Sequence, residues 1–341
     1  MTLLALETSC DETSASVVRD GRILSNVVSS QIQLHSEYGG VVPELATREH
    51  LKNLQPVTEA ACQEAGIQVA EVDAVAATQG PGLPAALMVG LKAAQAIAFA
   101  LGKPFLGINH HEAHLYSPWI WGEPLAAHFE QFESNVSLIV SGGHTLLVHV
   151  EAELKHRVLG STIDDAAGEC FDKVGKLIGL PYPGGPQMDR LAENGDARRF
   201  DFPRPMLRDA NDDFSFSGLK TSVRYFLRDH PALLDDAQSV RDLCASVQAA
   251  IVEVLVTKTM RAAERLGVRC VAASGGVTAN RSLRSELKKA CEQRGSTLRV
   301  ADRSLCTDNA AMIAVLAERK LMADPRGSFL DGDIAPGMAL G

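Results

Sequence analysis

The sequence lacks the cysteine patterns that would indicate a disulfide framework or a zinc ribbon. Its seven cysteines are scattered singly, none of them forms a Cys-x-x-Cys pair, and their number is odd. Scattered cysteines are typical of a reducing compartment, where most serve as small core residues. The N-terminal segment MTLLALE has no basic region and is too short for a secretory signal peptide. We therefore expect a cytoplasmic protein.

Aromatic residues and positive charge are also scarce. Aromatics make up 5% of the 341 residues, and the formal net charge is −9. This acidic balance argues against broad, non-specific nucleic-acid binding, although a local basic patch could still hold RNA. The longest apolar stretch, residues 84–101, contains Lys92 and Gln95, so we expect a buried helix there and no membrane span. No P-loop and no intact Gly-x-Gly-x-x-Gly occurs, which leaves a P-loop ATPase and a Rossmann dehydrogenase unsupported.

A pattern of strand, polar turn, strand and strand occurs twice along the chain. The first copy has its apolar runs at 3–6, 15–18 and 23–28. The second copy has its runs at 137–140, 146–150 and 158–159. Such a duplication predicts two related halves that face each other.

Helical and extended segments alternate after each copy, which argues for α/β layers. Further strands are expected at 74–77, 105–108 and 270–273. Helices are expected near 50–66, at 84–101, at 243–266, from 282 onward, and after 308 to about 322. We expect the first half to span 1–120 and the second half 121–341, with a helical, Gly/Pro/Arg-rich insertion at about 165–240. The helix after Asp308 can pack back on the first half.

Three loops rich in glycine or hydroxyl residues each follow a buried-looking strand, at 7–14, 141–145 and 274–280. Backbone N–H groups beside glycines form anion-binding sites, particularly next to a helix N-terminus. Three such loops in duplicated halves indicate a nucleotide bound in a cleft between the halves. The first loop is acidic, so we expect it to orient a cation and not to bind phosphate directly.

Two histidines, His110 and His114, face the same way if their segment is helical, because they are four residues apart. Together with Asp308 they would form a three-ligand metal site with open positions, as in a metal that contacts substrate. Spacing alone does not link Asp308 to the histidines, and His-x-x-x-His also arises by chance. A metalloprotease would need His-Glu-x-x-His, but the segment His111 to His114 is one residue too short.

Ten segments of the chain carry a family resemblance. They are, in order, ETSCDET (7–13), YGGVVPEL (38–45), GPGL (80–83), HHEAH (110–114), VSGGHT (140–145), IDDAAGE (163–169), YPGGP (182–186), DFSFSGLK (213–220), GGVTAN (275–280) and CTDN (306–309). With these segments the chain resembles the bacterial tRNA N6-adenosine threonylcarbamoyltransferases, the TsaD family, over residues 1 to about 315.

The resemblance implies a fold and a reaction. The fold is the actin-like, sugar-kinase and Hsp70-type ATPase (ASKHA) architecture, in which two ribonuclease-H-like halves enclose the site. The reaction transfers the threonylcarbamoyl group from threonylcarbamoyl-AMP to N6 of adenosine 37 of tRNAs that read ANN codons. The products are N6-threonylcarbamoyladenosine and AMP. Because the adenylate already activates the donor carbonyl, no covalent enzyme intermediate is needed.

The resemblance also implies roles for individual residues. The metal ligands would be His110, His114 and Asp308, with Fe²⁺ as the expected metal and Zn²⁺ as the alternative. The residues implied to contact the substrate or its nucleotide are Ile139, Val140, Ser141, Gly142, Gly143, Asp172, Gly185, Asp189 and Asn280. Glu112 is a candidate for orienting a histidine ligand, and Asp11 is a second candidate catalytic residue. With Asp308 placed at the end of the second half, the metal is expected to lie across the cleft.

Basic residues gather in one stretch despite the net charge. They are Arg198, Arg199, Arg204 and Arg208, followed by Lys220, Arg224 and Arg228. Such runs are often only solvated surface, but these flank the substrate segments, so we favour a path for tRNA. By resemblance, the partners are a TsaC-like synthase that supplies the donor, a TsaB-like paralogue and a TsaE-like ATPase, and no membrane. The helix near 50–66 is a possible docking face.

Three other functions deserve comparison. A metalloprotease is disfavoured by the histidine spacing and by the nucleotide-type loops. A sugar kinase on the same fold would leave the histidine pair without a role. A non-catalytic scaffold resembling the TsaB paralogue would lack the histidine pair and the Thr-Asp-Asn segment, and both are present. The sequence does not determine the metal, the oligomeric state or the surface that binds tRNA.

Overall fold

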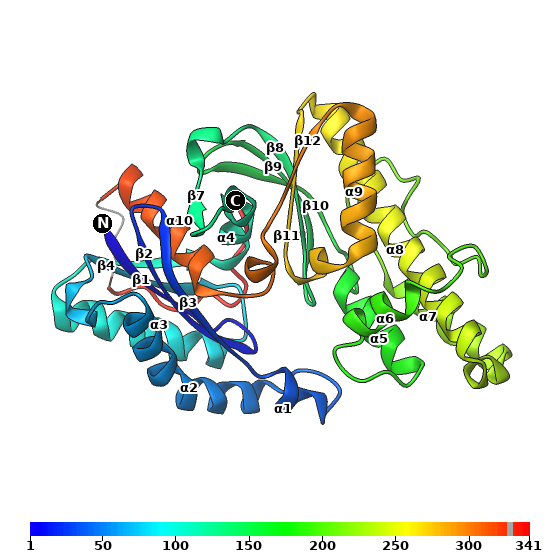
Figure 1. Ribbon diagram of the computed structural model, residues 1–341, viewed down its shortest axis with the longest axis horizontal. Coiled ribbons are helices and arrows are strands. Elements are labelled where there is room, and N and C mark those ends of the chain that lie inside the picture. The colour runs from blue at the N-terminus through cyan, green and yellow to red at the C-terminus, as the bar shows by residue number, and fades with distance from the viewer. Residues whose placement is uncertain (326–329) are drawn as a thin grey trace. The chain divides into compact units, whose positions relative to one another are not determined.

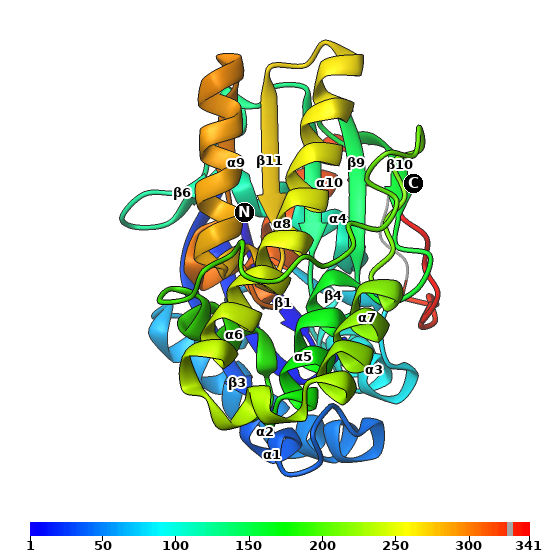
Figure 2. The ribbon, with the colours of Figure 1, turned by 90° about the vertical axis from the view of Figure 1, so that its right-hand side faces the viewer.

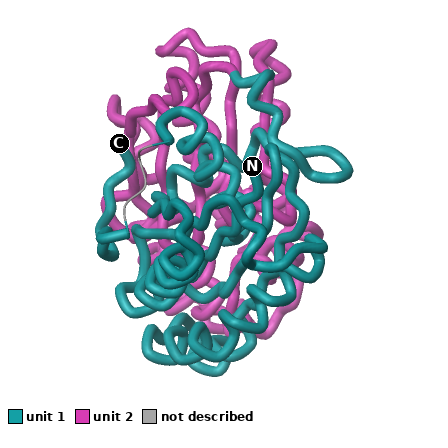
Figure 3. Tube along the Cα trace, turned by 90° about the vertical axis from the view of Figure 1, so that its left-hand side faces the viewer, with its two compact units in different colours: residues 1–132, 307–341 teal, residues 133–306 magenta. Residues whose placement is uncertain are grey.

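The chain forms two compact units, which Figure 3 shows in different colours. The computed structural model describes residues 1–325 and 330–341. Unit 1 contains residues 1–132 and 307–341, and unit 2 contains residues 133–306. The polypeptide therefore leaves unit 1, forms the whole of unit 2 and returns to unit 1 with its last helix.

Unit 1 is built on a sheet of seven strands in the order β5-β4-β1-β2-β3-β7-β6. The strands are β1 (Thr2–Glu7), β2 (Glu12–Arg19), β3 (Arg22–Ser30), β4 (Ala74–Gly80), β5 (Phe105–Asn109), β6 (Ile120–Trp121) and β7 (Ala126–Ala127). β1, β4 and β5 are parallel, whereas β2 is antiparallel to β1 and β3. Every residue of β1 is buried, as expected for a strand covered on both faces of its sheet.

Helices cover the two faces of this sheet (Figure 1). On one face, α2 (Pro43–Glu64) and α3 (Pro84–Leu101) pack against each other and against the strands, and α1 (Ile32–Ser36) precedes α2. On the other face, α10 (Ala310–Ala323) packs against β1, β2 and α4 (His110–Tyr116). Helix α2 begins earlier than the expected start near residue 50, because Pro43 at its first turn already has the φ that a helix requires.

Unit 2 is built on a sheet of five strands in the order β10-β9-β8-β11-β12. The strands are β8 (Asn135–Val140), β9 (Thr145–Ala152), β10 (Lys155–Ser161), β11 (Cys270–Ser274) and β12 (Thr297–Val300). The helices α8 (Ala237–Leu266) and α9 (Arg281–Arg294) lie side by side against this sheet (Figure 2). The stretch expected to be a helical insertion contains α5 (Ala167–Leu177), α6 (Gly184–Ala192) and α7 (Ser217–Asp229).

The two sheets share one plan. The series β3-β2-β1-β4-β5 in unit 1 and β10-β9-β8-β11-β12 in unit 2 have the same strand order. In both, the first three strands form antiparallel pairs and the last three form parallel pairs. This agreement confirms the duplicated α/β architecture expected from the repeated strand pattern.

Two helices, α3 and α8, are long and apolar enough to span a membrane if only length and composition are considered. In α8, 72% of the apolar window is buried inside the protein, compared with 39% in α3. One side of α3 packs on the sheet, and Gln95 in that helix donates a 2.6 Å hydrogen bond to the carbonyl of Gly332. Packing within unit 2 therefore accounts for the apolar character of α8, whereas α3 also exposes Met88 and Phe99.

Candidate functional site

The carboxyl ends of three parallel strands bring Glu7, Thr78 and His110 together in unit 1. Glu7 is the last residue of β1, and Thr78 follows Ala77, the partner of Leu6 on β4. On β5, Ile108 pairs with Thr78, and His110 comes two residues later. Parallel strands place their carboxyl ends at one edge of the sheet, where α/β proteins generally bind ligands.

Helix α4 presents the histidine pair. It begins at His110 because the side chain of Asn109 caps it, accepting a 3.1 Å hydrogen bond from the N–H of Glu112. Helical spacing places His110 and His114 on the same side, with their ring centroids 4.8 Å apart. Their exposed side-chain fractions are 7% and 1%, so both rings are withdrawn from solvent.

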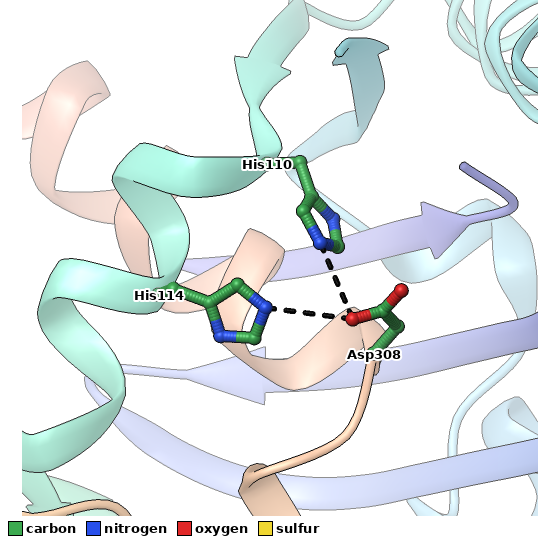
Figure 4. A group of neighbouring side chains, drawn as sticks. All are labelled: His110, His114 and Asp308. Atoms are coloured by element: carbon green, nitrogen blue, oxygen red, sulfur yellow. Dashed lines mark ion pairs between the residues drawn. The ribbon is translucent and has the colours of Figure 1, made fainter. Parts of the chain in front are cut away.

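Asp308 completes the cluster, as Figure 4 shows. Its Oδ1 atom lies 3.2 Å from Nε2 of His110 and 3.4 Å from Nε2 of His114. One donor atom from each of the three residues lies within 4.8 Å of the others. The structure therefore brings together the three residues that the sequence analysis linked.

The expected origin of Asp308 in the second half is wrong. All three residues belong to unit 1, because the chain returns to that unit at Thr307. The side chain of Asn309 caps α10, and Ser14 of β2 accepts a 2.9 Å hydrogen bond from the N–H of Ala310. These contacts attach the start of α10, and with it Asp308, to the same sheet that positions the histidines.

The electrostatics of the cluster depend on buried charges of opposite sign. Burial acts to lower the pKa of His110, but the carboxylates of Asp308 and Glu7 outweigh it and raise that pKa well above its usual range. Burial acts to raise the pKa of Asp308, but the two histidines outweigh it and lower that pKa well below its usual range. Burial lowers the pKa of His114, because its weaker interaction with Asp308 does not compensate.

The donor set fits a divalent metal. His114 is buried, and neither of its ring nitrogens has a well-formed hydrogen bond within the described part of the chain. A buried polar atom without a partner costs free energy, and coordination of a metal would satisfy it. Two imidazoles and one carboxylate form the ligand set of catalytic zinc sites and of non-haem Fe(II) sites with open positions.

The acidic loop after β1 adds negative charge near the cluster. Asp11 and Glu12 are both buried. Burial, together with the neighbouring carboxylates of Asp11 and Asp308, raises the pKa of Glu12 well above its usual range. A raised pKa favours the neutral form of Glu12, and the role of this loop in orienting a cation stays a prediction.

Glu112 differs from its expected placement. Its carboxylate is buried in α4 but lies 2.6 Å from the ammonium group of Lys320 on α10, with which it forms an ion pair. The carboxylate that contacts a histidine of the cluster is Glu7, whose Oε2 atom lies 3.0 Å from Nδ1 of His110. Sequence reasoning placed Glu7 in the acidic loop expected to orient a cation, but it did not pair this residue with His110.

In unit 2, two glycine-containing loops lie next to each other at the ends of β8 and β11. Ile139 pairs with Ser274, and a Cβ atom on Gly275 would lie only 2.4 Å from the carbonyl of Val140. The loop at Ser141 also closely approaches α5, because a Cβ atom on Gly168 would lie 2.4 Å from the Ser141 carbonyl. A side chain at Gly168 or Gly275 would collide with neighbouring backbone, which explains why glycine occupies both positions.

The other expected substrate residues of unit 2 lie on α5, on α6 and at the start of α9. The Asp172 carboxylate accepts a 3.0 Å hydrogen bond from the N–H of Gly185. Asp189 forms an ion pair with Arg281 at 2.9 Å. Asn280 caps α9 through the N–H of Leu283 and donates a 2.6 Å hydrogen bond to Gln248, a partner that the sequence analysis did not identify.

The basic stretch divides into paired and unpaired side chains. Arg204 pairs with Asp201 and Glu253, Lys220 pairs with Asp165, and Arg228 pairs with Asp229. The exposed residues Arg198 and Arg199 belong to no ion pair found among the described residues. Arg199 lies over the ring of Phe200, 5.8 Å from its centroid. Only part of the stretch is therefore available to bind an external anion.

Comparisons with known proteins agree with this arrangement. Residues 22–315 match the family TsaD: tRNA N6-adenosine threonylcarbamoyltransferase. The chain is 52% identical over 316 residues to a tRNA N6-adenosine threonylcarbamoyltransferase of Geotalea uraniireducens strain Rf4, covering 92% of this chain and 90% of that protein. A tRNA N6-adenosine threonylcarbamoyltransferase of Chlorobaculum tepidum is 49% identical over 351 residues, covering 99% of this chain and 96% of that protein.

A solved structure with little sequence similarity shares the fold. HypF of T. kodakarensis superimposes with a TM-score of 0.62 at 14% identity, covering 94% of this chain and 48% of that chain. Identity this low supports the architecture alone. The fold class expected from the sequence is thereby confirmed.

Proposed function

This chain belongs to the family of tRNA N6-adenosine threonylcarbamoyltransferases, and we propose that His110, His114 and Asp308 are the ligands of its divalent metal. The enzyme transfers the threonylcarbamoyl group from threonylcarbamoyl-AMP to N6 of adenosine 37 in tRNAs that read ANN codons, and AMP leaves. The observation that supports the ligand assignment is the convergence of these three side chains, with His114 buried and, among the described residues, without a well-formed hydrogen bond at either ring nitrogen.

Different residues of the chain are proposed to bind the metal and to stabilise negative charge during the transfer. A divalent metal bound at the cluster would polarise carbamoyl or phosphate oxygens of the donor. The two histidines and Asp308 would determine where that positive charge lies. The backbone N–H groups of Gly142 and Gly143 would stabilise negative charge that develops as the adenylate leaves, whereas the N–H of Ser141 already donates to the carbonyl of His144. Since the donor is already activated, alignment of the two substrates supplies much of the remaining rate enhancement.

Fe²⁺ is the proposed metal, with Zn²⁺ as the alternative. Two imidazoles and one carboxylate suit both ions, and open coordination positions are typical of non-haem Fe(II) sites. Protein purified without oxygen and without added metal would be analysed for metal content by mass spectrometry. Iron in near-stoichiometric amounts supports the proposal, whereas zinc alone in active protein overturns the choice of iron.

A histidine substitution tests the ligand assignment directly. In the variant His110→Ala, we expect loss of bound metal and loss of threonine transfer from threonylcarbamoyl-AMP to tRNA. The matched control is His128→Ala, which removes a partly exposed histidine of the same unit that is not part of the cluster. Full transfer by metal-free wild-type protein in the presence of chelator would contradict the metal proposal.

The segments of unit 2 are proposed to bind the donor. Ile139, Val140, Ser141, Gly142 and Gly143 would contact its carbamoyl or phosphate region. Asp172, Gly185, Asp189 and Asn280 would contact its nucleoside. The adjacent loops after β8 and β11 and the close approach of α5 support this assignment, because they bring glycine-containing backbone segments together at the ends of these strands.

Two exposed arginines that form no ion pair within residues 1–325 and 330–341 are proposed to contact tRNA. Arg198 and Arg199 are exposed, whereas neighbouring Arg204 is occupied by two carboxylates. Reversing both charges with Arg198→Glu and Arg199→Glu should weaken tRNA binding and reduce its salt dependence. The control reverses the exposed charges of Lys288 and Lys289 on α9. Equal affinity and an equal salt slope in the two double variants would contradict this path.

The protein partners and the cellular location of the enzyme are proposed from its family membership. A TsaC-like synthase would supply the donor, and a TsaB-like paralogue and a TsaE-like ATPase would assemble with the enzyme in the cytoplasm. On α2, Leu51 is 67% exposed, so a substitution at this position can test the proposed docking face. The variant Leu51→Glu should reduce co-purification with the TsaB-like paralogue, whereas undiminished co-purification would exclude this face.

A further inference from the structure

We infer that Glu7 is a positioning residue of the metal centre, whose carboxylate holds His110 in the tautomer that presents Nε2 to the metal. The inference rests on the proposed function, because it requires that the cluster of His110, His114 and Asp308 binds a metal. It concerns a residue outside the ligand set, at the end of a strand that the ligands themselves do not occupy.

The geometry around Glu7 is fully determined by its neighbours. The side chain is 0% exposed. Its Oε1 atom accepts a hydrogen bond from the backbone N–H of Ser9, and its Oε2 atom accepts one from the hydroxyl of Thr78. Nδ1 of His110 lies 3.0 Å from the same Oε2 atom. Both oxygens are therefore engaged, and the carboxylate cannot rotate away without losing several bonds.

The hydrogen bond between His110 and Glu7 determines which nitrogen of the His110 ring carries the proton. An ionised carboxylate only accepts hydrogen bonds, so Nδ1 must carry the proton that it donates to Glu7. In the neutral ring, Nε2 then has the lone pair that a metal requires. Nε2 is also the atom that faces Asp308, at 3.2 Å. A carboxylate bound to the outer nitrogen of a metal-ligating histidine is the usual way in which proteins fix tautomer and ring orientation.

The two histidines of the cluster differ in the hydrogen-bond partner of their Nδ1 atoms. Within the described part of the chain, Nδ1 of His114 has no hydrogen-bond partner, whereas Nδ1 of His110 has Glu7 and lies 3.3 Å from the Ser9 hydroxyl. His114 is held by the packing of α4 and by Asp308, whose Oδ1 atom lies 3.4 Å from its Nε2. His110 begins α4 and has little preceding helix to pack against, so it needs the carboxylate.

Replacement of Glu7 with glutamine creates a conflict that the site cannot resolve. If the amide oxygen faced His110, the amide nitrogen would face the backbone N–H of Ser9, and two donors would oppose each other. If the amide nitrogen faced His110, it would donate to Nδ1 and force the proton onto Nε2. The first arrangement destabilises the loop, and the second removes the lone pair that binds the metal.

Metal affinity is the measurement that tests this role. Full-length wild type, Glu7→Gln and Glu318→Gln would be titrated with Co²⁺ in competition with a chelator, while the visible spectrum reports coordination. Glu318 is the matched control, because it is a buried glutamate of unit 1 that binds the N–H of Gly21 and contacts no ligand of the cluster. We expect Glu7→Gln to bind Co²⁺ about 10- to 100-fold more weakly, with an altered spectrum, as for other outer-sphere partners. Glu318→Gln should match the wild type.

The possible outcomes are distinct. Wild-type affinity and an unchanged spectrum in Glu7→Gln would overturn the inference. If that variant does not fold, Thr78→Val replaces it, because this change removes one donor to Glu7 while keeping the side-chain shape. Several-fold weaker Co²⁺ binding by Thr78→Val supports the role, and unchanged binding overturns it. If the wild type does not bind Co²⁺, the proposed metal site itself is excluded. If His110→Ala loses its metal but Glu7→Gln binds metal like the wild type, the metal site stands and only the role of Glu7 is excluded.

Discussion

The Nε2 atom of His110 lies 3.2 Å from Oδ1 of Asp308, although the whole of unit 2 lies between these residues in the sequence. The return of the chain to unit 1 creates this contact. Ser14 on β2 and Asn26 on β3 accept hydrogen bonds from the first N–H groups of α10, which places the preceding Asp308 at the edge of the sheet. The proposed metal site therefore depends on one sheet and on the two chain segments attached to it.

The variant Asp308→Asn tests whether the carboxylate acts as a ligand. Asparagine has almost the same size, but it removes the negative charge that faces both histidines. We expect a larger loss of metal affinity than the about 10- to 100-fold typical of outer-sphere changes. Metal content after dialysis and transfer to tRNA would be measured together. The variant Asp302→Asn, which changes a helix-capping aspartate of unit 2, should keep its metal. A stoichiometric metal in Asp308→Asn would exclude Asp308 as a ligand.

Gly80→Ala should destabilise unit 1 through its C-terminal segment. A Cβ atom at Gly80 would lie 1.9 Å from the carbonyl oxygen of Ala335, so one backbone segment must move. Overpacking of this kind costs about 1–3 kcal/mol, which thermal or denaturant unfolding would detect. Gly218→Ala is the control, because nothing lies within 4 Å of a Cβ atom at that exposed helix position. Equal stability of the two variants would contradict the close approach.

Stability should depend on pH through Asp164. Partial burial acts to raise the pKa of this carboxyl, but hydrogen bonds from Ser215, Ser217 and the backbone at the start of α7 outweigh it and lower the pKa below the usual 3.8. A lowered folded-state pKa stabilises the protein above the unfolded value, and the stabilisation disappears as pH falls through the folded value.

The measurement compares wild type with Asp164→Ala. The wild type should have the higher melting temperature by a constant margin from pH 8 to about pH 5, since loss of hydrogen bonds to a charged group costs about 1.5–3 kcal/mol. Below about pH 4 the margin should shrink, because Asp164 becomes protonated in the wild type. A margin that stays constant down to pH 2 would show that the charge of Asp164 contributes nothing.

Two substitutions of Asn280 separate its structural role from the proposed nucleoside contact. Asn280→Ala removes the cap of α9 and should lower the free energy of unfolding by about 1 kcal/mol. Asn280→Ser keeps a capping oxygen, so it should restore most of that stability. If Asn280 contacts the donor nucleoside, both variants should raise the KM for threonylcarbamoyl-AMP. A normal KM in the serine variant would restrict Asn280 to the cap.

Local sequence patterns determined most of the secondary structure and the duplicated plan. The apolar run at 84–101 is the helix α3, with the same bounds, because Pro84 starts it and Gly102 ends it with a positive φ. The repeated strand pattern corresponds to two sheets with one strand order. The i, i+4 spacing of His110 and His114 was also sufficient to place both rings on one side of a helix, because helix geometry is local.

Long-range packing decided what each charged residue contacts. The sequence offered Glu112 as the partner of a histidine, but α10 packs against α4, so Lys320 binds Glu112. Glu7 reaches His110 only because β1 and β5 flank β4 in parallel and end at the same edge. The sequence also assigned Asp308 to the second half, whereas the packing of α10 on β1 and β2 attaches it to the first unit. Sequence determined the kinds of ligand and their local spacing, but strand order and helix packing decided which side chains meet, because these depend on contacts between residues far apart in the chain.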